Sequence, residues 1–410
     1  MVHTKHLRAF LAVARWGSLA RAAGELYRAP SAVSRSLREL ESSLETPLFE
    51  RRPGTWLLTE AGRVLQRRAR DALAELAEAR EALCRQFPER SATLLASPFF
   101  LLGVHERRLA ILIAFDERRH VGEVAQQLGL SQPAVSMALR EIEESLGIAL
   151  FDRAPSGIRL NEAGELLTPH VKRALSSLRL AVAEIALTKG VVTGQVVVGA
   201  LPFGRPYLLP VAIGRVLARH PLLSVRTVEA PLGRLVALLR VGDIDFLVGA
   251  LPPGRREEGL VREELLHEPM AVLARAGHPL ARKRRLRLEE CLRARWVLPQ
   301  KGTPTRDALA SVLERRGLAE PAVAVESADL SIIRGLLLET DMISAASRAL
   351  FQHELKTGAL VCLPVRLPGT ERPIGILRRT AEHSSPGAQL LIEALRAVPK
   401  VSPGRRTPSA

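Results

Sequence analysis

The chain has 410 residues and is 47% hydrophobic, which is enough to bury two or more cores. Its net charge of +16 is spread thinly, with +11 of it in residues 191–410, so charge alone is weak support for nucleic-acid binding. A membrane span is excluded because the longest apolar run, residues 94–104, is too short. Cys84, Cys291 and Cys362 fit no metal-ligand spacing, and they indicate buried small side chains in a reducing, cytoplasmic setting.

The first 62 residues predict a compact helical unit that ends in a two-stranded wing. Along its third helix an apolar stripe recurs at helical spacing, formed by Val33, Leu37, Leu40 and Leu44. The side chains expected to project outward are Arg28, Ser31, Ser34, Arg35 and Arg38. Pro53 and Gly54 turn the wing, which carries Arg51 and Arg52.

Residues 109–164 repeat residues 7–62 at a constant offset of 102, with 21 identities in 56 pairs. A repeat this long indicates two copies of one module, because solenoid periods are shorter. In the second copy we expect Ser131 to cap a helix and Pro133 to lie in its first turn. Its inward residues are Val135, Leu139, Ile142 and Leu146, and its outward residues are Gln132, Ala134, Ser136, Met137 and Arg140. Residues 153–160 predict a second wing, with Arg153 and Arg159 on it.

Two long helices are predicted at residues 60–87 and 161–189. The second has an apolar stripe from Leu166 to Ile185, which favours a dimerising helix; packing against the same chain is the alternative. The apolar run 94–104 is expected to pack between the two helical units. The domains are therefore predicted as 1–62, a linker helix and connector at 63–104, 105–164, a dimerisation helix at 165–190, 191–398, and a disordered tail at 399–410.

Two helices joined by a short turn, with small polar and basic residues early on the second, suit the major groove of DNA. An ordinary three-helix packing unit is the alternative, and the presence of two similar copies weakens it. Residues 1–90 carry 16 Lys and Arg against 11 Asp and Glu, whereas residues 91–190 carry 11 of each. Phosphate contact therefore favours the first copy, while the base-reading pattern favours the second.

From residue 191 strands alternate with helices, which predicts a parallel or mixed α/β sheet. The expected strands are 195–199, 224–230, 245–249, 269–274, 296–299, 323–326, 342–345 and 374–377. The expected helices are 202–218, 233–241, 307–316, 330–338 and 388–398.

The two copies resemble the winged helix-turn-helix of LysR-type transcriptional regulators. The first copy matches the family pattern at Ala22, Ala23, Leu26, residues 30–34, Leu40, Glu41, Leu48, Phe49, Arg51 and residues 59–62. The second matches it at Leu128, residues 131–136, Ile142, Glu143, Leu150, Phe151, Arg153 and residues 162–164. Residues 269–281, with Gly-His-Pro-Leu-Ala at the end, resemble the family's crossing strand and turn. The resemblance implies an α/β protein overall, with two all-α winged helix-turn-helix domains followed by a two-lobed, periplasmic-binding-protein-like effector domain.

The chain also departs from the family pattern. Ordinary members have one such unit, whereas this chain has two. The first copy has Arg28-Ala29-Pro30-Ser31 where the family usually shows Ser-Gln-Pro-Ala, and the second has Asn161 for the usual Thr. We hypothesise that both copies engage DNA in a dimer with four reading heads.

A two-lobed domain of this kind binds a small ligand at the carboxyl ends of its strands, where helix N-termini offer free N–H groups. The expected effector-binding residues are Leu201, Pro202, Phe203, Gly204, Ala250, Leu251, Thr303, Thr305, Arg306, Ser327 and Ser344. Thr303 and Thr305 are expected to hydrogen-bond a ligand while Arg306 attracts an anion; a plain N-cap with a solvated Arg306 is the alternative. Residues 302–306, 325–327 and 334–338 loosely resemble galactose-binding-protein regulators. A sugar therefore fits this cleft, and an organic or aromatic acid fits it equally well.

The sequence thus predicts a ligand-responsive regulator that binds double-stranded promoter DNA as a homodimer or homotetramer, with RNA polymerase as a further partner. An enzyme is disfavoured, because the chain has no nucleophile–base motif, phosphate-cradling loop or metal-spaced cluster. We expect no cofactor, metal or membrane partner. The competing class is a protein deficient in DNA binding, which only dimerises with other regulators or binds a small molecule.

Overall fold

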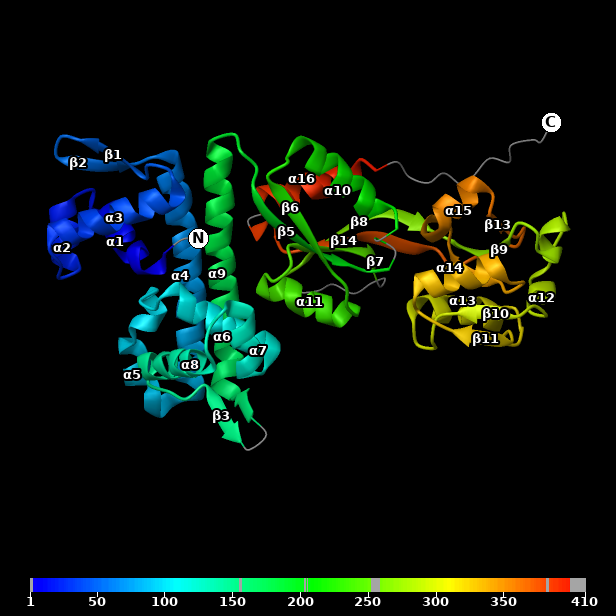
Figure 1. Ribbon diagram of the computed structural model, residues 1–410, viewed down its shortest axis with the longest axis horizontal. Helices are drawn as coiled ribbons and strands as arrows, with labels where there is room; N and C mark the ends of the chain where they lie inside the picture. Colours follow the sequence, from blue (N-terminus) through cyan, green and yellow to red (C-terminus); the bar gives the residue numbers. More distant parts are fainter. Residues whose placement is uncertain are drawn as a thin grey trace.

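The computed structural model describes residues 3–154, 157–202, 204, 206–251, 259–380 and 383–398. The predicted tail at 399–410, Phe203, the wing tip at 155–156 and the side chain of Arg153 lie outside the described part. Two helical units are attached to a pair of long helices, and an α/β region extends away from that pair (Figure 1). None of the helices in the described ranges combines the length and the hydropathy of a membrane-spanning segment.

Each helical unit has three helices followed by a β-hairpin. The first contains α1 (Thr4–Trp16), α2 (Leu19–Glu25), α3 (Pro30–Leu44), β1 (Phe49–Arg52) and β2 (Thr55–Leu58). The second contains α6 (Glu106–Arg118), α7 (Val121–Leu128), α8 (Gln132–Leu146), β3 (Phe151–Ala154) and β4 (Gly157–Leu160). The predicted inward stripes of α3 and α8 are buried. Ser131 caps α8 as predicted, by accepting a hydrogen bond from the Ala134 N–H at 3.3 Å.

The same internal bond connects the third helix to the wing in both units. Glu41 Oε1 accepts a hydrogen bond from the Leu48 N–H at 2.8 Å, and Glu143 Oε1 accepts one from the Leu150 N–H at 2.8 Å. Each pair fixes where the wing leaves the helix. The two units are therefore alike in their bonding as well as in their order of elements.

The long helices α4 (Glu60–Gln86) and α9 (Glu162–Thr188) begin and end within a residue of the predicted positions. Thr59 and Asn161 cap them, each accepting a hydrogen bond at 3.0 Å from the N–H three residues later. The apolar stripe of α9, expected to pair with a second copy, instead packs against α4 of the same chain within one hydrophobic core. The alternative of packing within the chain is thus the arrangement observed.

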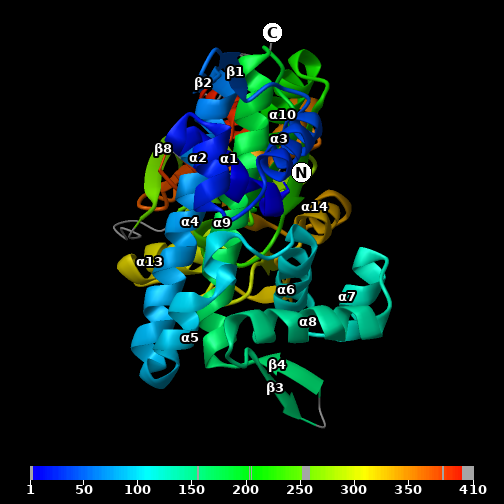
Figure 2. The ribbon, with the colours of Figure 1, turned by 90° about the vertical axis from the view of Figure 1, so that its left-hand side faces the viewer.

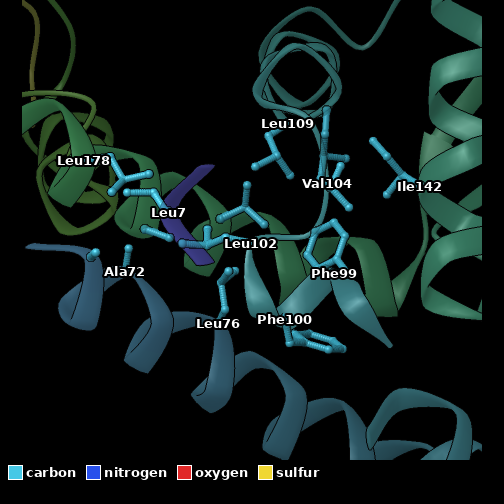
Figure 3. Packing of buried hydrophobic residues seen from close by; sticks show 14 of the residues in the cluster. Leu7, Ala72, Leu76, Phe99, Phe100, Leu102, Val104, Leu109, Ile142 and Leu178 are labelled. Atoms are coloured by element: carbon cyan, nitrogen blue, oxygen red, sulfur yellow. The ribbon is translucent and has the colours of Figure 1, made fainter. Parts of the chain in front are cut away.

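The connector between the units is folded into short helical segments. These are η1 (Pro88–Arg90), α5 (Ser91–Ala96) and η2 (Pro98–Leu101). Phe99, Phe100, Leu102 and Val104 are buried and lie between α4 and the second unit, as Figure 3 shows. The prediction that residues 94–104 pack between the two units is confirmed, because this segment belongs to the same core as both.

The first lobe of the α/β region is a mixed five-stranded sheet in the order β6-β5-β7-β14-β8. Its strands are β5 (Gly194–Ala200), β6 (Leu223–Val228), β7 (Phe246–Ala250), β8 (Val261–Glu268) and β14 (Arg372–Arg378), and its helices are α10 (Leu208–Arg219), α11 (Leu232–Val241) and α16 (Pro386–Arg396). The sequence did not predict β8, and it placed the start of α10 six residues too early.

The second lobe contains two small sheets, ordered β12-β9-β13 and β10-β11. The strands are β9 (Met270–Arg275), β10 (Trp296–Leu298), β11 (Val323–Glu326), β12 (Ser344–Ser347) and β13 (Leu360–Cys362). The helical segments are η3 (Pro279–Arg282), α12 (Leu288–Cys291), α13 (Pro304–Arg315), α14 (Leu330–Glu339), η4 (Arg348–Phe351) and α15 (Gln352–Thr357). The chain passes between the lobes twice, from β8 to β9 and from β13 back to β14. Cys291 is buried as predicted, whereas Cys84 and Cys362 are half-buried.

Candidate nucleic-acid interface and ligand cleft

The outward side of α3, here called the α3 face, is formed by Ser31, Ser34, Arg35 and Arg38. All are exposed except Ser34, which is half-buried. Arg28, just before the helix, is also exposed. The Arg35 side chain is 79% exposed, and its Nε lies 3.4 Å from Glu39 Oε1 in a surface ion pair. Such pairs are weak, so Arg35 can exchange Glu39 for a stronger acceptor.

The outward side of α8, here called the α8 face, is formed by Gln132, Ser136, Met137 and Arg140. Gln132 and Arg140 are exposed, as are Ser131 and Pro133 at the start of the helix. Met137 is 59% exposed, although no contact with DNA was predicted for it. A large apolar side chain exposed to solvent on this face is a candidate for contact with DNA. The signal in the sequence that could have indicated this role is its position in the repeat, which is equivalent to that of Arg35.

The structure corrects the register in which the first copy was compared with the family pattern. Because α3 begins at Pro30 and α8 at Gln132, Ala29 occupies the cap position held by Ser131. The departing tetrad is therefore residues 29–32, one residue later than predicted. Ala29 has no side-chain cap, so α3 lacks the capping bond of α8.

The wings add further basic side chains beside these faces. Arg51 and Arg52 are exposed on β1, and Arg159 is exposed on β4. The Arg51 guanidinium lies 4.7 Å from the centre of the Trp56 ring, a cation–π contact that orients it. The side chain of Arg153 lies outside the described residues, so its role stays a prediction.

In the first lobe, most of the predicted cleft residues lie at strand ends but point into the protein. Leu201 and Leu251 are buried in an apolar cluster beneath α11, so their side chains serve the core. Gly204 is buried against Val248, where a Cβ would lie 2.9 Å from the Val248 carbonyl oxygen. Pro202 is exposed and Ala250 is half-buried.

At the start of α13 the predicted roles change. Thr303 donates a hydrogen bond from Oγ1 to the Gln300 carbonyl at 2.7 Å and does not cap the helix through its side chain. Arg306 is buried, and its Nη2 lies 2.8 Å from Glu320 Oε2. The solvated alternative does not describe Arg306, because the side chain is buried. Its Nη1 has no hydrogen-bond partner among the described residues, so the anion-attracting role stays a prediction.

The hydrogen bond of Thr305 leads to Arg372, a residue that was not predicted from the sequence. Its Oγ1 accepts a hydrogen bond at 3.1 Å from Arg372 Nη1, which joins α13 of the second lobe to β14 of the first. Burial lowers the pKa of the Arg372 guanidinium, although the charge of Glu268 opposes this shift. A half-buried cation at the junction of the lobes suits an anionic or polyhydroxylated ligand.

The two predicted serines lie at strand ends in the second lobe. Ser327 Oγ accepts a hydrogen bond from the Asp329 N–H at 3.1 Å, so it serves the start of α14. Ser344 is buried at the start of β12, and its hydroxyl has no hydrogen-bond partner within the described part of the chain. Ser344 thus has the greater unused hydrogen-bonding capacity.

One buried cation connects the helical units to the α/β region. Lys172 Nζ, on α9, lies 2.8 Å from Asp243 Oδ2 in the first lobe and 3.0 Å from Asp116 Oδ2 in the second helical unit. Arg179 adds a hydrogen bond to the Gly242 carbonyl at 3.1 Å. The first lobe is therefore held against α9 and α6 at the loop after α11.

Glu75, Glu78 and His170 bring their ligand atoms close enough to hold a metal ion, a grouping that sequence spacing missed because it joins two helices. Arg173 already lies there: its Nε donates to Glu75 Oε2 at 2.8 Å, and its Nη2 is 2.8 Å from His170 Nδ1. A guanidinium at this point supplies the positive charge that the carboxylate needs. We assign the cluster to the contact between α4 and α9.

The protein family described as "Bacterial regulatory helix-turn-helix protein, lysR family" matches this chain twice, at residues 4–63 and at residues 107–165. The protein family described as "LysR substrate binding domain" matches residues 189–400. The chain belongs to the LysR family of transcriptional regulators.

Two similar proteins, both named as HTH-type transcriptional regulators, differ in how much of this chain they cover. The HTH-type transcriptional regulator GalR of Pseudomonas putida is 42% identical over 392 residues, which is 96% of each chain. The uncharacterized regulator YdcI of Escherichia coli is 31% identical over 299 residues, which is 72% of this chain and 96% of its own. The first relative thus matches this chain along both helical units and the α/β region, whereas the second leaves more than a quarter of it unmatched.

Two solved structures are similar in fold to this chain. Full-length OxyR from Pseudomonas aeruginosa has a TM-score of 0.54 at 25% identity and covers 71% of this chain and 94% of its own. CbnR, a LysR family transcriptional regulator, has a TM-score of 0.52 at 19% identity and covers 72% of this chain and 99% of its own.

Proposed function

We propose that this LysR-family regulator binds double-stranded promoter DNA through both of its helical units and responds to a small effector held between the lobes of its α/β region. The observation that carries the proposal is the repetition of one exposed polar face, on α3 and on α8, each beside a basic wing. Short polar and basic side chains on an exposed helix can reach base edges in the major groove.

In this proposal the contacts divide into two kinds. Ser34, Arg35 and Arg38 of the α3 face, with Ser31 beside them, read bases in one groove, and the α8 face reads bases in another. Arg28, Arg51, Arg52, Arg153 and Arg159 contact phosphates and set the position of each unit on the duplex. Gln132 and Pro133, at the start of α8, stand nearest the base edges of their groove.

The effector is proposed to lie near Arg372 and Thr305, with the backbone of residues 201, 202, 204, 250 and 251 on the facing lobe. An organic or aromatic acid would pair with the Arg372 guanidinium, and a sugar would use the Thr305 hydroxyl. Ser344 lies farther from the junction, because it pairs with Leu273 whereas Ser347, at the other end of β12, pairs with Met270 at the start of β9; it would contact only a ligand that reaches into the second lobe. Binding that favours one arrangement of the lobes would then be transmitted through Lys172 to α9 and α6.

Assembly into homodimers or homotetramers, action in the cytoplasm and contact with RNA polymerase belong to the same proposal. Since α4 and α9 cover one another, a second copy would attach through another surface. These expectations rest on the family resemblance.

A second candidate function is a regulator partner that does not itself bind DNA. It is favoured by the missing cap at Ala29 and by the balanced charge of residues 91–190. The missing cap bears only on the first helical unit and the balanced charge only on the second, so neither feature excludes DNA binding by the other unit.

Binding of fluorescent intergenic DNA at two salt concentrations, about 50 and 200 mM, tests the main proposal. We expect sequence-preferring binding that weakens steeply with salt, a further loss in Arg38→Ala and in Arg140→Ala, and the largest loss in the double variant. Arg234→Ala, an exposed arginine on α11, is the matched control. If no salt-sensitive, sequence-preferring binding is found, the second candidate is favoured.

Thermal unfolding in the presence of a panel of sugars and aromatic carboxylates tests the ligand cleft. A compound that binds the folded protein raises its melting temperature. We expect that rise to be lost in Arg372→Gln and kept in Arg293→Gln, which removes an exposed arginine of the second lobe. An unchanged rise in Arg372→Gln would place the cleft elsewhere.

A further inference from the structure

We propose that a single chain carries an internal pseudo-two-fold axis and therefore reads an inverted repeat whose two halves differ in sequence. This inference rests on the proposed function, because it requires both helical units to bind DNA. In a symmetric dimer of helix-turn-helix proteins, the two-fold axis of the protein is mirrored in a palindromic operator. Here both heads belong to one polypeptide and are not identical.

The pseudo-axis follows from the way α4 and α9 pack. Glu184 near the end of α9 accepts a hydrogen bond at 2.7 Å from Arg67 near the start of α4, and Glu75 of α4 accepts one at 2.8 Å from Arg173 of α9. Residue numbers rise along α4 as they fall along α9, so the helices are antiparallel. Each follows directly from the wing of its own unit, and exchanging the two helices therefore exchanges the two units.

The first helices of the two units meet between the heads. Thr4 Oγ1, at the start of α1, donates a buried hydrogen bond at 2.8 Å to the Val104 carbonyl, just before α6. His3 Nδ1 lies 2.5 Å from Glu106 Oε1. His3 and His105 are equivalent in the repeat, so the contact joins equivalent ends of the units. Together with the shared core, it fixes the position of one head relative to the other.

The heads lie at opposite ends of the long helices. Figure 2 shows β1 and β2 near one end of the α4–α9 pair and β3 and β4 beyond the other. A helix of 27 residues is roughly 40 Å long. Successive major grooves on one side of B-DNA are about 34–36 Å apart. The pair therefore has a length suited to two half-sites centred one helical turn apart.

The repeat also predicts where the two halves agree and where they differ. Ser34 is equivalent to Ser136 and Arg38 to Arg140, so these positions read the same bases in both halves. Arg35 is equivalent to Met137, and both side chains are exposed. Arginine bonds the O6 and N7 of guanine, whereas an apolar side chain contacts the methyl group of thymine. The half read by α3 is thus expected to carry a guanine where the half read by α8 carries a thymine.

In vitro selection of random duplexes on the full-length protein, followed by sequencing of the bound fraction, tests this inference. The wild type should select an inverted repeat with unequal halves. Met137→Arg should change one base position in the α8 half by about ten-fold in preference and leave the other half unchanged. Arg35→Met should change only the α3 half. Both side chains are exposed, and unchanged melting temperatures would show that the variants fold.

The alternatives give different results. If both halves change together in Met137→Arg, or if neither changes, each half is read by the same head of two separate chains and the inference is overturned. Selection of a direct repeat would overturn it as well. If no sequence is enriched by the wild type, the proposed function itself fails. If the enriched motif changes only in Arg35→Met, the proposal that the protein binds DNA stands, and the inference that both helical units of one chain read the site is rejected.

Discussion

Lys172 Nζ lies 2.8 Å from Asp243 Oδ2, and this ion pair ties the long helix α9 to the first lobe of the α/β region. The Lys172 side chain is only 6% exposed, and Asp116 of the second helical unit shares it. One buried cation on α9 therefore connects this helix to the second helical unit and to the first lobe.

Lys172→Met should destabilise the protein by about 3 kcal/mol, because it removes the buried cation between Asp243 and Asp116 and leaves Asp116 with only the Arg119 guanidinium, 3.0 Å away. The free energy of unfolding in urea measures this. Lys301→Met is the control, since Lys301 is 72% exposed and pairs with Glu320 at the surface. A loss no larger than that of the control would show that the buried pair contributes nothing to stability.

The same ion pair predicts a dependence on high pH. Burial opposes the charge on Lys172, but the hydrogen bond that Lys172 donates to Asp243 and the charges of Asp243 and Asp116 raise its pKa above the ordinary value. A raised lysine pKa stabilises the fold fully below the unfolded pKa of about 10.4, and this stabilisation declines as the pH rises through the folded value. The difference in melting temperature between wild type and Lys172→Met should therefore be constant from neutral pH to about pH 10 and shrink above it.

Glu75 predicts a dependence on low pH. Burial opposes its charge, but hydrogen bonds from His170 and Arg173 lower its pKa below the ordinary value. Its stabilising effect is thus present above the unfolded pKa of about 4.3 and is lost as the pH falls through the folded value. The melting temperature of Glu75→Gln should lie below that of the wild type near pH 6 and approach it in acid. A gap that stayed constant down to pH 3 would argue against a charged Glu75 at the α4–α9 contact.

Gly62→Ala should destabilise the first helical unit by roughly 2 kcal/mol. A Cβ at this position would lie 2.2 Å from the Leu48 carbonyl oxygen, so the wing and α4 must move apart. Gly24→Ala is a matched control, because a Cβ there has nothing within 4 Å and α2 is a helix. Urea unfolding should show a loss for the first variant and no loss, or a small gain, for the second.

Arg35→Ala and Arg52→Ala should weaken DNA binding in different ways. Arg35→Ala is expected to cost about 1–3 kcal/mol on the selected sequence and much less on random DNA, because it removes a base contact. Arg52→Ala, on the wing, should weaken binding to both DNAs alike and lower the salt dependence. Equal losses on cognate and random DNA for Arg35→Ala would refute the assignment of Arg35 as a base-reading residue.

The best predicted parts of the fold are those with local signals at both ends. α4 and α9 follow Thr59 and Asn161, whose side chains cap the first turn, and apolar residues recur at helical spacing along both helices. The third helix of each unit was equally clear, because its stripe is short, regular and repeated. What sequence could not decide was the partner of the α9 stripe, since the stripe is the same whether the second helix comes from its own chain or another.

The errors in the α/β region have physical causes. β8 is an edge strand with charged side chains along it, a composition that protects edges but hides the strand pattern. The burial of Arg306 against Glu320 was not predicted, because Glu320 lies beyond the end of α13. Arg372 was missed because its contact with Thr305 joins residues 67 positions apart, which no local pattern records.

The internal pairing of α4 with α9 has a consequence for how this regulator and its promoters change over generations. When an inverted repeat is read by two copies of a protein with a single head, every substitution in the reading helix is present in both halves, so a base change in one half of the operator cannot be matched without harm to the other half. Here a mutation in the codon for Met137 leaves the codon for Arg35 untouched. Each half of the binding site can therefore change in sequence and be matched by a substitution in its own reading helix, although both helices are encoded by one gene.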